Sequence, residues 1–505
     1  MTYATYLVVV LTSLAGVKDQ LEEAINEAQE QFRDKLTRAA LDFLSSGVSP
    51  SSSFAFEHQL AELTRELARQ TLASLLNTLE NDDAESLPHD VRYQAGGYRR
   101  INRRTRNQRV ATLFGTIELR RYPYRYWHRG VAEATIFPLE IQLGLVRGAT
   151  PALAEAVGRY VAAAGATQNA VLDRLRQQHA VHWGAERLRA FTEQCSQAMA
   201  EATREFQVRR ILQLLEEAEK SRGNRKPVLA AGRDGCTLCE YDYRYFEHAT
   251  VGTLTVYERS GKRLGTVYLA FVPEEGQTRM TEELTALILE VLRRWQGTLP
   301  RLVYVTDAGD QETKYYQQVL RRMRHPTSGH KLSWMRIVDF YHVAQRVWTM
   351  AEALFGQGTQ RGQAWARKMC KLLKKPNGAS RVLHSAAALR ARMGKMSKAR
   401  KDDLRRAYEY LRKRTRFLRY HEFKNLHLPI GSGVTEAACK TIYAQRMKLS
   451  GMRWSKAGAQ SILNLRVAWL SGIWSDAYEY ILNSYNDTTL TTYAAHRNQA
   501  LCIAA

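Results

Sequence analysis

The feature that most constrains the fold is the order of apolar segments between Lys226 and His342. Short apolar runs typical of strands cover residues 227–232, 251–257, 266–272, 302–306 and 335–338. An amphipathic helix is predicted from Leu284 to Trp295, after the third run, and another around Tyr315 to Met323, after the fourth. The turn at 259–262 predicts a hairpin between the second and third strands. The predicted order is three strands, helix, strand, helix, strand.

This order predicts a mixed α/β fold, because helices that cross between strands produce parallel pairing. An antiparallel start followed by helix-crossed parallel strands is the order of an RNase H-like fold. Sites in such sheets form at the carboxyl ends of strands. Asp234 and Asp307 are both predicted there, each next to a glycine-bearing turn, and Glu436 lies three residues into a later predicted helix. Three carboxylates favour Mg²⁺ or Mn²⁺, and two such ions can stabilise the attacking and leaving oxygens of a phosphoryl displacement.

Each of these acids also has an ordinary structural interpretation. Aspartate beside glycine usually caps a turn. Glu436 could complete a capping box with the preceding Gly-Ser-Gly or pair with Lys440 one helical turn later. The strand order and the surrounding charge favour the metal site over three unrelated caps.

The charge of the chain points to a polyanionic partner. The sequence has 74 Lys+Arg against 50 Asp+Glu, a formal net charge of +24. Most of the excess lies in a predicted helical insertion, where residues 361–424 contain 21 Lys+Arg and four acids. A solvated helical surface normally mixes both signs, so contact with nucleic-acid phosphates is the favoured interpretation.

Two other basic segments are predicted to contact DNA. Residues 99–129 contain ten arginines and one acid, interleaved with aromatic residues. Alternation predicts one strand from Ala111 to Arg121, and the alternative for this ribbon is a solvated surface. The second segment follows Glu436, where four bases would hold the backbone and Trp454 would stack on a displaced base. The residues predicted to bind DNA are Arg99, Arg100, Arg103, Arg104, Arg106, Lys440, Arg446, Lys448, Arg453 and Trp454.

The first 220 residues are predicted to be largely helical outside that ribbon. Amphipathic patterns at 17–36 and 56–79 predict a helical hairpin, with dimerisation as the alternative role. Three further helices, at 152–164, 168–179 and 183–200, are broken by Gly165 in a way typical of a helix-turn-helix unit. A simple three-helix connector would give the same pattern.

The remaining signals concern compartment and other cofactors. Six scattered cysteines match no disulfide framework, and the apolar run from Tyr6 to Leu11 is too short to span a bilayer. These features predict a reducing, cytoplasmic location without membrane contact. The pair Cys236 and Cys239 could be half a zinc site, but buried thiols are favoured because no second pair has matching spacing.

Several motifs carry a resemblance to a known family. They are Asp234-Gly235, Thr306-Asp307, Asp339-Phe340-Tyr341-His342, the run Gly431 to Glu436, Arg446-Met447-Lys448 and Gly451-Met452-Arg453-Trp454. Together they resemble the bacterial insertion-sequence transposases of the Kra type, within the Mutator-like group of DDE transposases. The likeness covers about residues 99–474, and the block around Glu436 is its most specific part.

The resemblance implies an RNase H-like catalytic domain interrupted by a helical insertion, and cut-and-join chemistry at transposon ends. It assigns the catalytic, metal-binding triad to Asp234, Asp307 and Glu436, with Asp339 and His342 as accessory residues. It also implies two Mg²⁺ or Mn²⁺ ions, double-stranded DNA as partner, a homodimer on DNA and a nucleoid-associated location. One departure is that Asp307-Ala308-Gly309-Asp310 stands where relatives have Asp-Gly-Ala, which leaves Asp310 as an alternative ligand.

The expected organisation therefore has seven parts. They are an N-terminal helical region at 1–90, an arginine-rich β-ribbon at 91–148, a helix-turn-helix-like region at 149–222, the first part of the catalytic core at 223–345, the basic insertion at 346–427, the second part of the core at 428–475 and a tail at 476–505. Two other functions stay open. One is a structure-selective nuclease of the same fold, and the other is a domesticated DNA-binding protein without catalysis.

Overall fold

The computed structural model describes residues 3–79, 98–100, 106–128, 131–132, 135, 137–239, 246–391, 394 and 396–487. Arg103 and Arg104, two predicted DNA contacts, lie outside the described residues. The chain divides into two compact units. One contains residues 1–161, 166–195 and 478–505, and the other contains residues 162–165 and 196–477.

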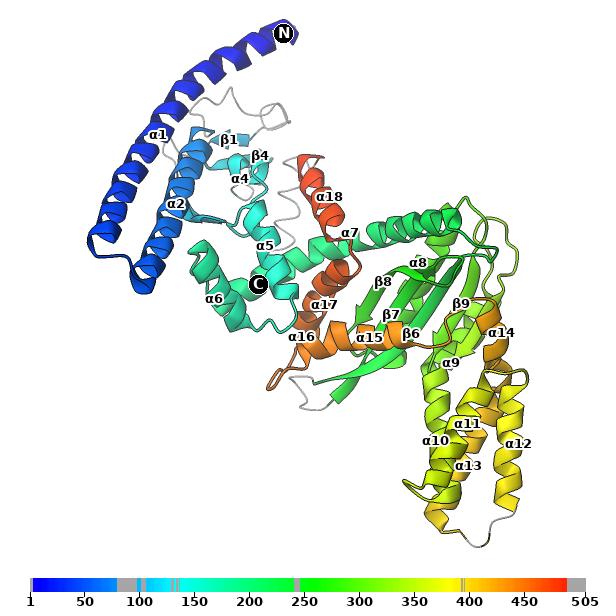
Figure 1. The fold of residues 1–505 in the computed structure, drawn as a ribbon. Coiled ribbons are helices and arrows are strands. Elements are labelled where there is room, and N and C mark those ends of the chain that lie inside the picture. Colours follow the sequence, from blue (N-terminus) through cyan, green and yellow to red (C-terminus); the bar gives the residue numbers. More distant parts are fainter. Residues whose placement is uncertain are drawn as a thin grey trace. The chain divides into compact units, whose positions relative to one another are not determined.

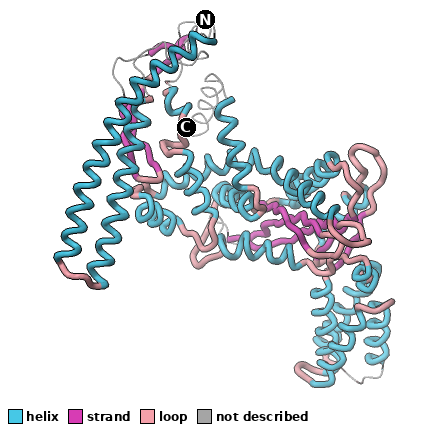
Figure 2. Tube along the Cα trace, turned by 45° about the horizontal axis from the view of Figure 1, so that its top comes forward, coloured by secondary structure: helices cyan, strands magenta, loops and turns pink. Residues whose placement is uncertain are grey.

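The first unit begins with two long helices, α1 (Tyr3–Ser45) and α2 (Pro50–Thr78), which pack side by side as Figure 2 shows. Ser49 caps α2 through a reciprocal capping box with Ser52. The predicted helical hairpin is therefore present, and each helix is longer than its apolar pattern indicated. The end of α2 packs on the β-ribbon, where the Asn77 side chain hydrogen-bonds the backbone of Glu118 and Arg120.

The ribbon differs from the sequence prediction. The single strand expected from Ala111 to Arg121 is a hairpin of β2 (Arg106–Thr112) and β3 (Gly115–Arg121). The chain reverses at Leu113 and Phe114, and the Thr112 hydroxyl bonds both sides of this turn. Gly115 has φ +122°, which a residue with a side chain rarely adopts. A separate small sheet contains β1 (Tyr98–Arg100), β4 (Tyr124–His128) and β5 (Val131–Ala132).

The helices predicted after the ribbon are present, with one difference in length. They are α5 (Pro151–Ala162), α6 (Gln168–His179) and α7 (Ala185–Lys220), and a short helix that was not predicted, α4 (Pro138–Gln142), precedes them. The third helix of the expected helix-turn-helix unit is thus one continuous helix that runs far beyond Ala200. Gly165 has φ +70° in the turn between α5 and α6, as its position as a helix breaker predicted.

The second unit is built on a five-stranded mixed sheet in the order β10-β9-β6-β7-β8 (Figure 1). The strands are β6 (Val228–Cys239), β7 (Phe246–Tyr257), β8 (Arg263–Phe271), β9 (Arg301–Thr306) and β10 (Trp334–Val338). Strands β6, β7 and β8 pair antiparallel, while β9 lies parallel to both β6 and β10. The predicted order of strands and helices is confirmed, and the chain has a mixed α/β fold.

Helices cover both faces of this sheet because successive side chains of a strand point to opposite faces. Leu229 and Ala231 of β6 join a core with α7, α8 (Thr278–Arg294) and α9 (Asp310–Gln318). Val228 and Ala230 join a second core on the other face. This second core continues into the helical insertion, which contains α10 (Phe340–Phe355), α11 (Gln360–Leu373), α12 (Gly378–Ala391), α13 (Lys398–Arg414) and α14 (Tyr420–Asn425).

The chain returns from the insertion to the sheet through a short, interrupted helix. It consists of α15 (Gly433–Ala438), a π-helical turn from Cys439 to Ala444, and α16 (Gln445–Met447). Two longer helices follow, α17 (Lys456–Leu470), which packs on β8, and α18 (Trp474–Asp487). Single π-turns of this kind are frequent at functional sites. In the part of the chain that the structure describes, no helix combines the length and apolar character needed to cross a bilayer.

Candidate active site

Asp234 lies within β6, which corrects the prediction that it ends a strand. The strand runs on to Cys239, but its parallel pairing with β9 stops at Gly232. Asp234 therefore follows the end of the parallel part, where β6 pairs with β7 alone. One of its carboxylate oxygens accepts a hydrogen bond from the Gly235 N–H at 2.7 Å.

Asp307 directly follows β9, as predicted. Its Oδ1 accepts a hydrogen bond from the Gly309 N–H at 2.9 Å, so the turn-capping interpretation also describes part of its role. The insertion holds this loop from α13, because the Tyr410 hydroxyl donates to the Asp307 carbonyl oxygen at 2.6 Å and Arg414 donates to the Ala308 carbonyl oxygen at 3.1 Å. The alternative ligand, Asp310, is exposed in the first turn of α9.

Glu436 reaches the sheet because a glycine lets α15 approach closely. A Cβ on Gly232 would lie 2.1 Å from the Thr435 hydroxyl and 2.6 Å from that of Thr253. The two threonine hydroxyls hydrogen-bond each other at 2.9 Å and fix α15 on β7. Gly232 and Asp234 lie on the same face of β6. The close contact therefore places the helix that carries Glu436 over the face that carries Asp234.

The accessory residue Asp339 is fully buried and works as a structural clamp. One oxygen accepts the His342 N–H at 2.7 Å and caps α10. The other accepts both the backbone N–H and the hydroxyl of Ser432, in the turn before Glu436. The Ser432 hydroxyl also lies 2.6 Å from Glu436 Oε1. Because a hydroxyl carries one hydrogen, it donates to one carboxylate at a time.

His342 completes a cluster around Glu436. Its Nε2 lies 3.6 Å from Glu436 Oε1, and both side chains are partly exposed. Among the described residues, one group of three potential metal ligands has all its donor atoms within 4.8 Å of one another: Asp339, His342 and Glu436. The two oxygens of Asp339 already accept the N–H groups of His342 and Ser432, and the Ser432 hydroxyl lies 2.9 Å away, so much of its capacity for an ion is taken up.

The Asp234 carboxyl is influenced by the charges of both Asp307 and Glu436. Burial raises the pKa of the Asp234 carboxyl, and the negative charges of Asp307 and Glu436 raise it further. The thiol of Cys439, three residues after Glu436, lies 3.5 Å from Asp234 Oδ2. The charges of Asp307 and Glu436 thus disfavour the charged form of Asp234, and a bound divalent cation would relieve this repulsion.

A fourth acid at this edge of the sheet was not predicted. Glu312 in α9 is 7% exposed, and burial together with the charges of Asp307 and Asp234 raises its pKa. A Cβ on Gly309 would lie 2.3 Å from Glu312 Oε2, so the carboxyl folds back on the Asp307 loop. In the sequence, Glu312 stands three residues after Gly309. This spacing is typical of a helix cap and does not by itself predict a site residue.

The basic residues after Glu436 fall into two groups. Lys440, Lys448 and Arg453 are exposed, although Lys448 Nζ also donates to Thr237 at 3.1 Å. Arg446 is 4% exposed and its guanidinium lies over the Trp454 ring, 5.4 Å from its centroid. The guanidinium that was predicted to hold the DNA backbone is therefore buried against Trp454 in this structure. Burial lowers the pKa of Arg446 to about 10, because removal from water disfavours the charged form of the guanidinium.

The other predicted DNA contacts are Trp454, which packs within the fold, and three arginines of the first unit. Trp454 is partly buried and its indole N–H donates to the Met447 carbonyl oxygen at 2.9 Å, so it closes the loop between α16 and α17. Arg106 is exposed at the start of β2. Arg99 and Arg100 form part of β1.

Comparison with known proteins adds no assignment. No protein-family model matches the sequence, and no curated protein matches it.

Proposed function

We propose that the chain is a DDE-type DNA transposase. It cleaves phosphodiester bonds at transposon ends in a metal-dependent reaction and joins the freed 3′-hydroxyl to target DNA. The observation that carries the proposal is that Asp307 and Glu436 lie near enough to Asp234 for their charges to raise the pKa of its buried carboxyl. Its family-level support is the resemblance to the Kra-type transposases.

The fold supports an RNase H-like assignment for the catalytic unit. The sheet has an antiparallel β6-β7-β8 part, and β9 and β10 add in parallel on the other side of β6. The helical insertion interrupts the unit between β10 and α15, where the resemblance predicts an insertion. Asp234 lies in the sheet, Asp307 directly follows β9 and Glu436 belongs to the segment after the insertion, as the assigned triad requires.

The donor set fits Mg²⁺ or Mn²⁺. Asp234, Asp307 and Glu436 offer hard carboxylate oxygens, and 47% of the Glu436 side chain is exposed to incoming substrate. Two bound ions would activate the attacking oxygen and stabilise the leaving oxygen. Asp339 and Ser432 orient Glu436, while Lys440, Lys448 and Arg453 hold the phosphate backbone beside it.

The insertion supplies a further basic surface for this substrate. Residues 361–424 have 21 Lys+Arg against four acids, and acids that are present pair locally, as Asp402 does with Arg405 and Asp403 with Arg406. Most of the positive charge therefore has no acidic neighbour in the sequence to offset it. We propose that the chain acts as a homodimer on double-stranded DNA in the cytoplasm, associated with the nucleoid.

End-dependent strand joining tests the function. A supercoiled donor that carries the flanking transposon ends is incubated with the protein and a target plasmid, with Mg²⁺ or with EDTA. A transposase gives joined products only with Mg²⁺ and only from the donor with ends. Cleavage that ignores the ends would favour the structure-selective nuclease, and end binding without any cleavage would favour the non-catalytic DNA-binding protein.

A further inference from the structure

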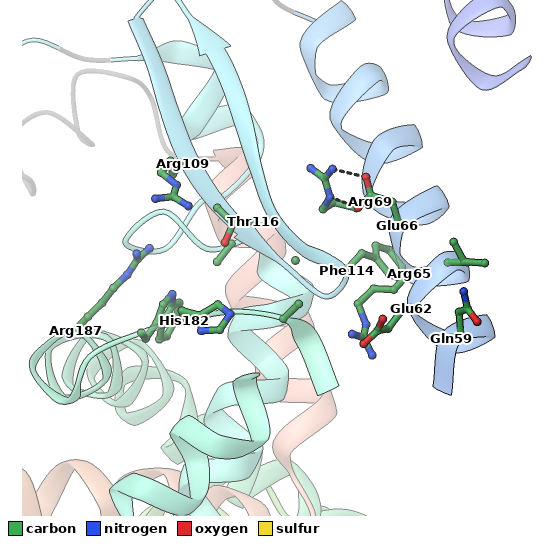
Figure 3. Close-up of a pocket in the computed structure, with 15 residues that line it drawn as sticks. Gln59, Glu62, Arg65, Glu66, Arg69, Arg109, Phe114, Thr116, His182 and Arg187 are labelled. Atoms are coloured by element: carbon green, nitrogen blue, oxygen red, sulfur yellow. Dashed lines mark hydrogen bonds and ion pairs between the residues drawn. The ribbon is translucent and has the colours of Figure 1, made fainter. Parts of the chain in front are cut away.

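A cavity in the first unit is lined by none of the predicted site residues, although Arg109 in its wall lies three residues after Arg106 in β2. It has a volume of about 720 Å³. Its walls come from α2, the β2–β3 hairpin and the segment that leads into α7, as Figure 3 shows. Cavities of roughly 300–1,000 Å³ are the size that small ligands occupy. The size suits a compact group rather than a double helix.

The tip of the hairpin is held firmly against its neighbours, so the cavity has fixed walls. Arg69 crosses the hairpin at Gly115, where an added Cβ would lie 3.1 Å from its Cδ. The same arginine forms a bidentate ion pair with Glu66, at 2.7 and 2.6 Å. On the other side, the His179 ring hydrogen-bonds the Leu113 carbonyl oxygen at 2.9 Å and is held in turn by the Tyr160 hydroxyl.

The cavity has an excess of positive charge once the Arg69–Glu66 pair is set aside. Three further guanidinium groups line it, from Arg65, Arg109 and Arg187, against the single carboxylate of Glu62. Arg187 donates to backbone carbonyl oxygens of Arg147 and Gly148. Within the described ranges, neither Arg65 nor Arg109 forms an ion pair. Each guanidinium group suits phosphate oxygens, which it can bind with two parallel hydrogen bonds.

An aromatic ring is present beside these cations. Phe114, at the turn of the hairpin, lines the cavity and is 39% exposed, although it is a large apolar residue. Trp183 on the opposite wall is buried, with the Arg187 guanidinium over its ring at 4.8 Å. An exposed ring with a guanidinium group beside it, as Phe114 has in Arg65, is a combination that binds an unpaired base and its phosphate (Figure 3).

We propose that this cavity binds an unpaired nucleotide of a DNA strand, with its base against Phe114, its own phosphate at Arg65 beside that ring, and Arg109 at the far end of the cavity for a neighbouring phosphate of the strand (Figure 3). The inference rests on the proposed function, because it takes DNA as the partner of the chain. It adds a binding site for a single-stranded or extruded nucleotide to a protein otherwise expected to hold duplex DNA. An intact base pair would not enter, since its bases are stacked within the helix.

The test compares binding of two labelled DNA duplexes that differ only in a three-nucleotide single-stranded overhang. Fluorescence anisotropy is measured with the full chain at fixed salt and in EDTA. The wild type is expected to bind the overhang duplex at least about fivefold more tightly than the blunt duplex, the low end of what base–aromatic stacking contributes. The variant Arg65→Gln/Arg109→Gln and the variant Phe114→Ala should lose this preference.

Arg189→Gln is the matched control, because it removes one exposed arginine of α7 that does not line the cavity. It should keep the preference, and thermal unfolding should verify that every variant folds. Equal binding of the two duplexes by the wild type would overturn the proposal, as would an unchanged preference in both cavity variants. Tight binding of a free nucleoside monophosphate without overhang preference would also contradict it. Since the assay needs no metal or cleavage, a chain that fails as a transposase can still show the preference.

Discussion

The buried carboxylate of Asp339 accepts two hydrogen bonds from Ser432, one from its backbone N–H and one from its hydroxyl at 2.9 Å. These bonds join the end of β10 to the turn that begins α15. The Ser432 hydroxyl also lies 2.6 Å from Glu436 Oε1, so the clamp extends to the predicted metal ligand. Asp339, which the family resemblance gives only as an accessory residue, is therefore bonded to the turn that positions Glu436.

Ser432→Ala removes the side-chain part of this clamp and leaves the backbone bond in place. We expect DNA cleavage to fall by about 10- to 100-fold, the range typical of outer-shell partners of metal ligands, because Glu436 loses its orienting hydroxyl. Cleavage rates and thermal unfolding are measured together, with Ser328→Ala as an exposed serine control. A variant that cleaves as fast as the wild type would show that the hydroxyl does not position Glu436.

Gly232→Ala tests the close approach of α15 to the sheet. The new methyl group would meet the Thr435 hydroxyl at 2.1 Å, so helix and strand must separate. We expect a loss of about 1–3 kcal/mol in the free energy of unfolding, as overpacked sites show. Gly235→Ala is the matched control, because its Cβ would meet nothing closer than 3.7 Å. Equal stability of the two variants in urea unfolding would contradict the packing argument.

Metal binding distinguishes the predicted triad from the closer cluster of Asp339, His342 and Glu436. We expect Asp234→Asn to weaken Mn²⁺ binding by more than about tenfold, since it removes a ligand, and His342→Ala to weaken it by less. Electron paramagnetic resonance of free Mn²⁺ measures both affinities. The reverse order, with His342→Ala more damaging, would place the ion in the cluster instead.

An ion pair between α7 and α8 predicts how stability depends on pH. Arg294 binds both carboxylate oxygens of Glu205, at 2.9 and 2.8 Å, and this hydrogen bonding lowers the pKa of Glu205. A lowered folded-state pKa gives stabilisation that is complete above the unfolded pKa and is lost as pH falls through the folded pKa. Arg294→Met should therefore lower the free energy of unfolding by about 1 kcal/mol at pH 7 and by less at pH 3. Solvent screening of this partly exposed pair limits the effect at pH 7.

Urea unfolding at the two pH values measures this difference. Arg321→Met, at an exposed arginine, should change stability little at either pH. The ion-pair explanation fails if Arg294→Met costs the same free energy at pH 3 as at pH 7.

The arrangement of the sheet could be predicted because it depends on apolar patterns within each segment. Alternation and helical periodicity from Pro227 to Val338 gave every strand and the order of the helices. The hairpin at Leu113 was missed because both its strands continue the same alternation, and the only local signal is Gly115. The extension of β6 past Asp234 was missed because the glycine after Asp234 indicates a turn, whereas pairing with the following strand β7 keeps the chain extended as far as Cys239.

The choice of the three acids rests on local sequence features, whereas the surroundings of the basic residues do not follow from the sequence. Asp234, Asp307 and Glu436 were selected by strand ends and a glycine turn, which are local features. The burial of Arg446 under Trp454 depends on how the loop to α17 folds back, and a basic residue in a basic segment gives no sign of it. Glu312 was missed for a related reason, because only the fold brings α9 against the end of β6.

Strand cleavage by wild type and Glu436→Gln tests the central claim most directly. The supercoiled donor with its transposon ends is incubated with each protein in Mg²⁺ and in EDTA, and binding to the ends is measured in parallel, with Glu352→Gln as an exposed control on α10. We predict metal-dependent products from the wild type and from the control, and none from Glu436→Gln, which still binds the ends. Undiminished cleavage by Glu436→Gln would contradict the assignment of this acid to the metal site.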